Sequence, residues 1–323
     1  MKLPFRQKSC IIASTNNKGK MHLNSYKFIV NPVAGGGKAR SLMPKIEKKF
    51  KEAGAEFDIY VTKGPKDAIE AAARAASEGF NIIVAVGGDG TVNEVLNGIV
   101  HTETALAAIH GGKGNDFATA VNMPRNLDEA CTALLRANTK SIDLGKVLDR
   151  YFINSVGVGF DAAVALRANQ GVRPFKGVSA YIYSFLNMLY SYEPVEMIID
   201  LGNGPVQNTP LLVAVGIGTA YGGGMRIVPD AIQDDGLFDV CVMDVMNRLS
   251  LIYHFPKVFS GTLKNLEQAG MYRTSEVKLS LSEPRPLHLE GEILFGDKLH
   301  FTLKPKGMKV LWFDDSDNIK VKV

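Results

Sequence analysis

A glycine-rich turn carrying one carboxylate constrains the fold of this chain more than any other feature. The turn is Gly87-Gly88-Asp89-Gly90-Thr91, and it directly follows the apolar run Ile82 to Val86. An apolar run without a polar break predicts a strand that is buried on both faces. The next apolar residues recur at helical spacing, at Val92, Val95, Leu96 and Ile99. The turn is therefore predicted to join a buried strand to a helix.

A turn in that position predicts a phosphate-binding site. The first N–H groups of a helix lack intrahelical partners, the helix dipole favours an anion there, and glycine lets a phosphate come close. Asp89 would repel that phosphate unless a cation lay between them, so it indicates Mg²⁺ or a proton-transfer role. Two alternatives stay open, because Asp89 could simply cap the following helix and the turn could be a plain strand-to-helix connection.

Size and composition are those of a soluble globular protein. The 323 residues suffice for two domains, and 46% of them are hydrophobic and 22% charged. The net charge of +4 is mild, but Glu47 is the one acidic residue between Met1 and Lys51. This basic region could attract an anionic surface such as phospholipid headgroups, or it could be a solvated basic segment. We predict no nucleic-acid partner.

The cysteines and the apolar segments indicate a cytoplasmic protein. Cys10, Cys131 and Cys241 are far apart, which argues against a disulfide framework or a zinc site. No apolar run is long enough to cross a bilayer, so we predict no transmembrane segment and a protein that is soluble or peripheral at a membrane. Residues 1–25 are predicted to be an N-terminal extension, with Met21 as an alternative start.

Residues 26–141 have the pattern of an α/β domain. Apolar runs at 27–30, 57–61, 82–86 and 105–109 alternate with helical segments at 39–52, 65–78 and 92–99. This alternation predicts a mostly parallel sheet covered by helices, which binds ligands at the carboxyl ends of its strands. Three loops are expected to converge there, at residues 31–38, 87–93 and 110–117.

Residues 142–303 have the pattern of an antiparallel β domain, with short β-type runs separated by Gly, Pro, Asn and Asp. The aromatic segment Val178 to Tyr190 is predicted to be a helix too short to span a membrane. It could line an apolar groove, contact a bilayer surface, or be ordinary core. Uncovered strand edges would allow a homodimer.

Several motifs in a fixed order resemble a known family. They are Asn31-Pro32 with its Gly-rich loop, Gly87-Gly88-Asp89-Gly90-Thr91, Gly114-Asn115-Asp116-Phe117-Ala118, Asp143-Leu144-Gly145, Asn154 to Asp161, and Asp234-Asp235-Gly236-Leu237. From about Tyr26 onward the chain resembles the diacylglycerol kinase catalytic family, particularly the soluble bacterial lipid kinases, with sphingosine and ceramide kinases as more distant relatives. The resemblance implies a three-layer α/β nucleotide-binding domain, a C-terminal antiparallel β-sandwich, and a C-terminal segment, 304–323, that returns to the first domain.

The resemblance also implies site residues. ATP would be bound by Asn31, Pro32, Val33, Ala34, Gly35, Thr62, Gly87, Gly88, Asp89, Gly90, Thr91, Val92, Asn93 and Lys113. A catalytic Mg²⁺ would be organised through water by Asp89, Asp116 and Asp143. A second, structural Mg²⁺ would be bound by Asp235 and the carbonyls of Leu237 and Ile232.

Two positions depart from the family pattern. Lys113 stands where a threonine is usual, and Glu290-Gly291-Glu292 stands where Asp-Gly-Glu is common. The longer Glu290 side chain moves its carboxylate by about one methylene, and catalytic geometry responds to shifts of about 1 Å. A lipid hydroxyl needs a base, and Glu292 and Glu290 are the candidates, with Glu292 at the more constant position. The alternative is a polar turn whose acids face water.

The predicted function is transfer of the γ-phosphoryl group of ATP to a lipid hydroxyl at a membrane surface, with diacylglycerol giving phosphatidic acid. Sphingoid and polyprenol lipids are alternative acceptors. NAD kinase is a further alternative, because it resembles this family in its Gly-Gly-Asp-Gly turn and two-domain plan. The departures at Lys113 and Glu290 also leave open a non-catalytic lipid or nucleotide sensor.

Overall fold

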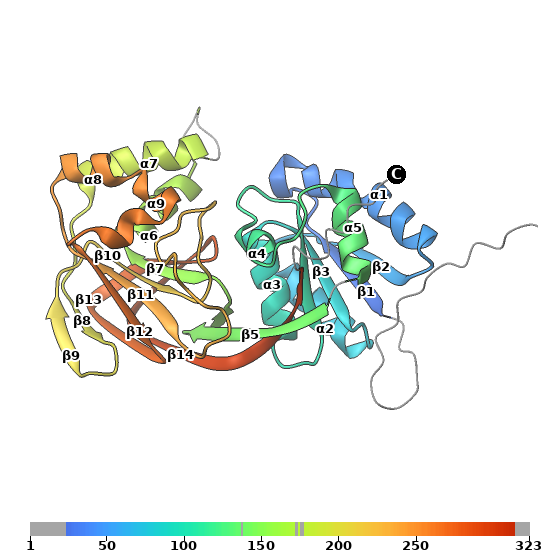
Figure 1. The fold of residues 1–323 in the computed structure, drawn as a ribbon. Helices are drawn as coiled ribbons and strands as arrows, with labels where there is room; N and C mark the ends of the chain where they lie inside the picture. The colour runs from blue at the N-terminus through green and yellow to red at the C-terminus, as the bar shows by residue number, and fades with distance from the viewer. Residues whose placement is uncertain (1–23, 137, 172–173, 175–177, 314–323) are drawn as a thin grey trace, which may run out of the picture.

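One mixed sheet of 14 strands runs through both halves of the molecule in the computed structural model (Figure 1). The structure describes residues 24–136, 138–171, 174 and 178–313. Most of the predicted N-terminal extension, with Met21 and Cys10, and residues 314–323 of the predicted C-terminal segment lie outside them. Among the described residues, no helix combines the length and apolar composition needed to span a bilayer.

The first half alternates strands and helices as predicted. Its elements are β1 (Ser25–Val30), η1 (Ala34–Gly36), α1 (Lys38–Glu52), β2 (Glu56–Val61), α2 (Asp67–Ser77), β3 (Ile82–Gly87), α3 (Asp89–Ile99), β4 (Ala105–His110), α4 (Asp116–Ala120) and α5 (Leu127–Arg136). The strands run parallel in the order β4-β3-β1-β2. Strands β1, β3 and β4 are buried along their whole length, which explains their unbroken apolar runs. Helix α3 starts at Asp89, three residues before the predicted start.

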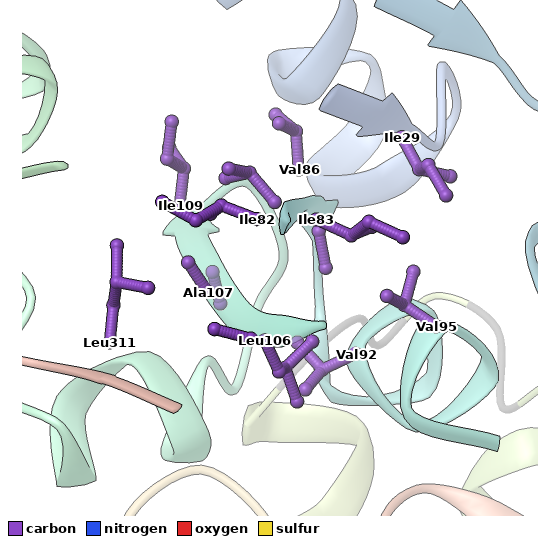
Figure 2. Packing of buried hydrophobic residues seen from close by; sticks show 14 of the residues in the cluster. Ile29, Ile82, Ile83, Val86, Val92, Val95, Leu106, Ala107, Ile109 and Leu311 are labelled. Atoms are coloured by element: carbon purple, nitrogen blue, oxygen red, sulfur yellow. The ribbon is translucent and has the colours of Figure 1, made fainter. Parts of the chain in front are cut away.

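Helix packing in this half relies on small residues. The buried face of α2 is built from Ala68, Ala71, Ala72 and Ala75, at helical spacing. Gly98 of α3 faces this helix, where an added Cβ would lie 2.3 Å from the Ile69 carbonyl oxygen. Val92 and Val95 project from α3 toward the sheet, and Leu311, from the far end of the chain, lies in the same core (Figure 2).

The second half is mainly antiparallel. Its elements are β5 (Asn138–Val147), β6 (Arg150–Phe152), β7 (Ser155–Gly159), α6 (Phe160–Asn169), α7 (Val178–Ser191), β8 (Met197–Asp200), β9 (Pro205–Asn208), β10 (Leu212–Gly216), β11 (Phe238–Met243), α8 (Arg248–His254), α9 (Lys257–Ser260), η2 (Thr262–Asn265), β12 (Ala269–Thr274), β13 (Glu276–Leu289) and β14 (Glu292–Trp312). The main path of strands is β12-β11-β10-β7-β13-β14.

The one helix predicted in this half, at residues 178–190, is accompanied by others in the structure. Helix α7 is confirmed, but α6, α8 and α9 also form. The sequence hides α6 because the helix begins at Phe160, directly after β7 ends at Gly159, so no loop marks its start. Helices α8 and α9 have only seven and four residues, too few for periodicity to show.

Strand β14 joins the two halves. It has 21 residues, pairs antiparallel with β13 and β5, and pairs parallel with β4 at Val310 and Leu106. In Figure 1, β5 and β14 run side by side from one half to the other. The boundary predicted between residues 141 and 142 falls within β5, and that between 303 and 304 falls within β14. The sheet is therefore continuous where the domains were expected to separate.

Candidate functional site

Loops from three parallel strands meet at the carboxyl edge of the first half. The order of the strands reverses between β1 and β3, which is the point where open α/β sheets bind ligands. The backbones of the loops lie in close contact. A Cβ added at Gly35 would lie 2.5 Å from the Gly111 oxygen, and a Cβ added at Gly112 would lie 2.2 Å from the Gly88 Cα. The predicted convergence of these loops is confirmed.

A cavity of about 730 Å³ lies over these loops, and we call it the glycine-loop cavity. Of the predicted nucleotide residues it is lined by Asn31, Val33, Ala34, Gly35, Gly88, Asp89, Gly90, Thr91 and Lys113. A neighbouring cavity of about 230 Å³ contains Pro32 and Thr62 and shares Asn31 and Thr91 with it. Most of the predicted nucleotide residues therefore surround connected space.

Val92 and Asn93 lie elsewhere. The Val92 side chain is buried in the hydrophobic core (Figure 2), and the Asn93 side chain points to the second half of the molecule. The N–H groups of Thr91 and Val92 already donate to the Gly88 carbonyl, at 2.9 and 3.1 Å. The predicted anion site at the start of α3 is thus limited to N–H groups before Thr91. Gly87 packs against the Thr91 side chain, and a Cβ added at Gly87 would lie 2.4 Å from Thr91 Oγ1.

A second cavity, of about 340 Å³, lies between the two halves, and we call it the central cavity. It is lined from the first half by Asp89, Lys113 and Asp116, and from the second half by Asn154, Tyr221, His288 and Glu290. The central and glycine-loop cavities share five residues, namely Asp89, Lys113, Gly114, Glu290 and Gly291. Among the described residues that line these two cavities, Lys113 alone carries a positive charge.

Asp89 caps a helix, but not the helix that follows it. Its Oδ1 accepts hydrogen bonds from the N–H groups of Asp116 and Phe117, at 2.7 and 3.3 Å, and its Oδ2 accepts one from Asn115 at 2.8 Å. These amides open α4, so Asp89 ties the loop after β3 to the loop after β4. Burial raises the pKa of Asp89 although the three amides oppose the shift.

Asp116 is the second carboxylate of this cluster. It is buried, and its Oδ2 accepts a hydrogen bond of 2.9 Å from the Gly223 N–H of the second half. Burial and then the charge of Asp89 raise the pKa of Asp116 to about 6. A cation bound between these two neighbouring carboxylates would stabilise their ionised forms.

Asp143 is not part of this cluster. Its side chain is fully buried, Oδ1 accepts from the Lys306 N–H at 2.8 Å, and Oδ2 accepts from the Gly236 N–H at 2.7 Å. It lines neither cavity. Of the predicted acidic trio, the structure brings together Asp89 and Asp116, whereas Asp143 holds the loop before β11 against β14.

At the predicted second Mg²⁺ site, the acidic side chains of the loop form ion pairs. The Asp235 carboxylate accepts from the Leu237 N–H at 3.1 Å and is ion-paired with Arg273. The two other acids of this loop are also paired, Asp230 with Lys264 and Asp234 with Lys140. Ile232, whose carbonyl was the third predicted ligand, is about half exposed, at 49%. The second Mg²⁺ site at Asp235, Leu237 and Ile232 stays a prediction.

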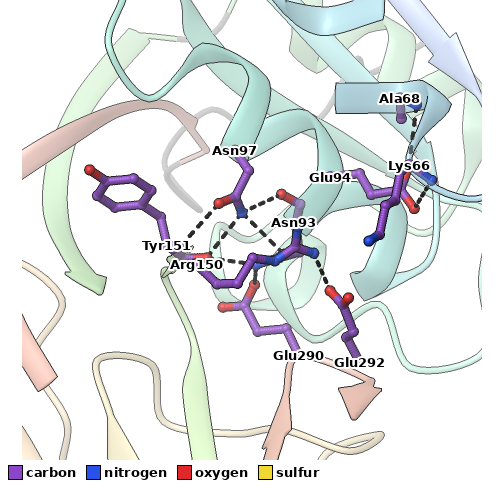
Figure 3. A network of polar contacts seen from close by, with 9 residues as sticks. All are labelled: Lys66, Ala68, Asn93, Glu94, Asn97, Arg150, Tyr151, Glu290 and Glu292. Carbon is purple, nitrogen blue, oxygen red and sulfur yellow. Dashed lines mark hydrogen bonds and ion pairs between the residues drawn. The ribbon is translucent and has the colours of Figure 1, made fainter. Parts of the chain in front are cut away.

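The Glu290-Gly291 pair forms the two-residue turn between β13 and β14. Both residues have positive φ, 49° and 93°, as a tight hairpin turn requires. Glu290 does not face water, contrary to the alternative considered above. Its carboxylate is buried and accepts hydrogen bonds from the N–H groups of Ile153 and Asn154, at 2.8 and 2.5 Å. Figure 3 shows the third hydrogen bond, which Asn93 Nδ2 donates at 2.8 Å. Burial raises the pKa of Glu290 to about 7, against these three donors.

Glu292 has a different environment. Its carboxylate is ion-paired with Arg150 of β6 (Figure 3), and it lines neither the glycine-loop cavity nor the central cavity. Asn97 lies beside this pair and accepts a hydrogen bond of 3.0 Å from the Tyr151 N–H. Glu290 therefore joins the second half to α3 of the first half and reaches the shared wall of the cavities, whereas Glu292 is paired within the second half.

Comparison with known proteins places this geometry in a family. Residues 25–147 match the model of the diacylglycerol kinase catalytic domain, and residues 154–312 match the YegS C-terminal NAD kinase beta sandwich-like domain. The chain is 30% identical over 269 residues to a diacylglycerol kinase of Bacillus subtilis (strain 168), covering 82% of this chain and 89% of the relative. The chain belongs to the diacylglycerol kinase family. It is a lipid kinase, a phosphotransferase.

Two further known proteins match this chain over most of its length. A diacylglycerol kinase of Staphylococcus haemolyticus (strain JCSC1435) is 30% identical over 275 residues, which cover 84% of this chain and 83% of the relative. A crystal structure from Bacillus anthracis str. Sterne superposes with a TM-score of 0.76 at 24% identity, covering 92% of this chain and all of that one. The predicted fold class, an α/β domain followed by a β-sandwich, is confirmed.

The sequence did not predict one group of buried polar residues beside the central cavity. Asp161, Tyr221 and His288 are buried together beside the central cavity, with Asp161 Oδ2 2.9 Å from the Tyr221 hydroxyl and 3.0 Å from His288 Nε2. Asp161 ends a family motif, but no spacing rule links it to a histidine 127 positions away. Only the pairing of β13 with β7 brings them together.

Proposed function

We propose that this lipid kinase transfers the γ-phosphoryl group of ATP, with Mg²⁺, to the free hydroxyl of diacylglycerol and so forms phosphatidic acid. The observation that carries the proposal is the shared wall of the two cavities. Asp89, Lys113 and Glu290 border both the glycine-loop cavity and the central cavity. A phosphoryl group at this wall would touch a donor on one side and an acceptor on the other, as in-line transfer requires.

The donor side is the glycine-loop cavity. Its glycines allow close approach of a phosphate chain, and the adjoining cavity with Thr62 offers room for the rest of the nucleotide. Asn31 Nδ2 donates to Thr91 Oγ1 at 3.2 Å, which holds the loop after β1 to the start of α3. The nucleotide roles of these residues stay predictions.

The residues at the junction fit a catalytic Mg²⁺. Asp89 and Asp116 supply two carboxylates, and burial raises the pKa of both, with the charge of Asp89 adding to the shift of Asp116. In the described part of the chain no group of three His, Cys, Asp or Glu side chains is arranged to hold a metal. Mg²⁺ commonly binds through one or two carboxylates together with substrate phosphates and water, and when bound it would neutralise charge on the transferred group.

The acceptor side suits a lipid. An apolar cavity between α6, α7, α8 and the sheet is lined by residues such as Phe160, Phe185, Leu251 and Phe255. It meets the central cavity at Tyr181 and Met225, which line both. This apolar cavity has a volume of about 60 Å³, so it has room for only a short part of an acyl chain, and the polar end of such a lipid would lie in the central cavity. This arrangement favours a lipid over NAD as the acceptor.

We propose that the enzyme works in the cytoplasm at a membrane surface, where its acceptor resides. Large apolar side chains are exposed on the two helices that cover the apolar cavity, namely Ile182, Leu186 and Tyr190 on α7 and Leu249 and Tyr253 on α8. Helix α7 thus combines a core face, with Phe185 and Leu189 buried, and an exposed apolar face. Such a patch is typical of contact with a membrane or partner. The predicted homodimer stays a prediction.

The test incubates the protein with labelled ATP and Mg²⁺ and with one of four acceptors: diacylglycerol in micelles, a sphingoid base, a polyprenol or NAD. We expect label in phosphatidic acid above the other products. Label in another lipid would change the acceptor, and label in NADP alone would remove the lipid assignment. If the protein bound nucleotide and lipid without transferring phosphate, it would be the non-catalytic sensor that the sequence left open.

A further inference from the structure

We propose that Lys113 is a catalytic residue whose ammonium group stabilises the negative charge on the phosphoryl group during its transfer. The inference rests on the proposed function, and it assigns a role to the lysine that stands where the family usually has a threonine. Lys113 borders both the glycine-loop cavity and the central cavity, so it lies on the path of the transferred group.

The walls of the two cavities are acidic. They contain the carboxylates of Asp89, Glu94, Asp116 and Glu290, whereas Lys113 is the one lysine or arginine among the described residues that line them. These carboxylates repel a phosphoryl group that enters the space, and at the transition state the charge of that group is spread over three oxygens. A cation on the wall offsets this repulsion where the transfer occurs.

The backbone of Lys113 is fixed at the shared wall. The Asn115 side chain closes the loop, because its Oδ1 accepts from the Gly112 N–H at 2.8 Å and its Nδ2 donates to the Gly112 carbonyl at 3.0 Å. Gly114 lies against Asp89, since a Cβ added at Gly114 would lie 2.3 Å from Asp89 Oδ2. Both neighbours of Lys113 are thus anchored, and its Cα has a fixed position beside Asp89.

The Lys113 side chain is available to a ligand. It is exposed, and it has no hydrogen bond or ion pair with another residue in the described part of the chain. The carboxylate of Asp89 is directed elsewhere, since its two oxygens accept from the three N–H groups that open α4. A lysine is a compact charge on a flexible four-carbon stem with three rotatable donors. Its ammonium group can therefore follow a phosphoryl group from one cavity to the other.

In the proposed step, the acceptor oxygen bonds to the γ-phosphorus while its proton passes to the carboxylate of the β13–β14 turn. Glu290 is the glutamate of that turn that borders this wall. The bond from the phosphorus to the bridging oxygen breaks, and the nucleoside diphosphate leaves with the electron pair. Lys113 donates N–H bonds to a non-bridging oxygen of the transferred group and exchanges no proton. Release of the proton from Glu290 to water restores the enzyme.

The test measures kcat and KM of the full chain with ATP, Mg²⁺ and diolein micelles. We expect Lys113→Met to lower kcat by about 10²–10³-fold, the range for loss of a group that stabilises developing charge. Lys113→Arg should keep most of kcat, whereas Lys113→Thr should be as slow as Lys113→Met because a hydroxyl has no charge. Lys298→Met is the matched control, because Lys298 is an exposed lysine of β14 that lines none of the cavities described above.

Nucleotide affinity separates a catalytic lysine from one that only binds ATP. An interaction that strengthens in the transition state lowers kcat, whereas uniform binding of substrate and transition state changes the affinity alone. Calorimetry should therefore give nearly the same Kd for ATP with wild type and with Lys113→Met. A raised Kd with an unchanged kcat would make Lys113 a nucleotide-binding residue and overturn the catalytic role.

Chemical restoration of the amine separates its charge from its bulk. Lys113→Cys should be as slow as Lys113→Met, and alkylation with 2-bromoethylamine, which rebuilds a lysine-like side chain through the sulfur, should restore most of the lost kcat. Iodoacetamide adds a neutral amide to the same sulfur and should restore nothing. Wild type treated with each reagent is the control for the three cysteines of the natural sequence.

Three outcomes decide between the proposals. An unchanged kcat in Lys113→Met, or equal restoration by the two reagents, would overturn the charge assignment and leave the proposed function standing. A Lys113→Thr variant as fast as wild type would show that a hydrogen bond suffices and would also overturn it. If the wild-type chain phosphorylates no lipid, the proposed function fails and the Lys113 assignment fails with it.

Discussion

Glu290 shows how one residue can hold two halves of a protein together at an electrostatic cost. Its carboxylate joins Asn93 of α3 to the start of β7, through donors that lie up to 197 positions away in the chain. Three hydrogen bonds satisfy the charge, yet burial still raises the pKa of Glu290 to about 7. The folded state therefore binds a proton more tightly than the unfolded state does.

This shift predicts a pH dependence of stability. The pKa of Glu290 in the folded state, about 7, lies above the ordinary value of 4.5. Its contribution to the stability of the fold is therefore fully present below pH 4.5 and is lost as the pH rises through 7. We expect the free energy of unfolding to change less with pH in Glu290→Gln than in wild type, by up to about 3 kcal/mol. Urea unfolding between about pH 5 and about pH 8 measures it. Parallel curves for the two proteins would contradict the prediction.

The proposal of a catalytic Mg²⁺ depends on another single residue, Asp89. Asp89→Asn keeps the shape of the side chain but removes the charge that Mg²⁺ would need. We expect kcat for lipid phosphorylation to fall by about 10²-fold or more, as when a charge-stabilising group is lost. Asp58→Asn is the control, because Asp58 forms an ion pair with Lys27 on β1 and lines none of the cavities described above. Full Mg²⁺-dependent turnover by Asp89→Asn would remove Asp89 from the metal site.

At the scale of elements, the contact between α2 and α3 depends on one missing side chain. An added Cβ at Gly98 would lie 2.3 Å from the Ile69 oxygen and 2.8 Å from the Ala72 Cβ. Helix α3 also carries Asp89, Thr91 and Asn93, so a displaced helix would disturb the site. The packing of two helices thus sets the position of the phosphate loop.

We expect Gly98→Ala to destabilise the fold by about 1–3 kcal/mol, because the new methyl group overpacks the interface by more than it gains in helix propensity. Gly64→Ala is the control, since its added Cβ meets nothing within 4 Å. Urea unfolding of the two variants measures the difference. A Gly98→Ala variant as stable as wild type would mean that α2 shifts without cost.

At the scale of the whole molecule, β14 makes the two halves interdependent. The strand begins at the Glu290-Gly291 turn and ends in the core of the first half, where Leu311 is fully buried. Its last residues pair with β5 and touch β4. The first half is therefore completed by residues from the far end of the chain.

We expect Leu311→Ala to destabilise the first half by about 2–5 kcal/mol, the usual cost of a buried cavity. Hydrogen exchange should show lost protection in β4, about 200 positions earlier in the sequence. Lys309→Ala is the control, because its ion pair with Glu103 is exposed and such pairs contribute about 1 kcal/mol or less. Loss of protection confined to the second half would show that β14 is dispensable to the first.

The chain on its own determined the alternation of strands and helices in the first half, the three loops and the family. These depend on local periodicity, glycine turns and ordered motifs, which short stretches encode. Tertiary structure decided which carboxylates share a wall, that Asp143 and Glu292 are engaged elsewhere, and that His288 meets Asp161. Those contacts join residues 27 to 197 positions apart, so they exist only once the sheet has brought distant strands together.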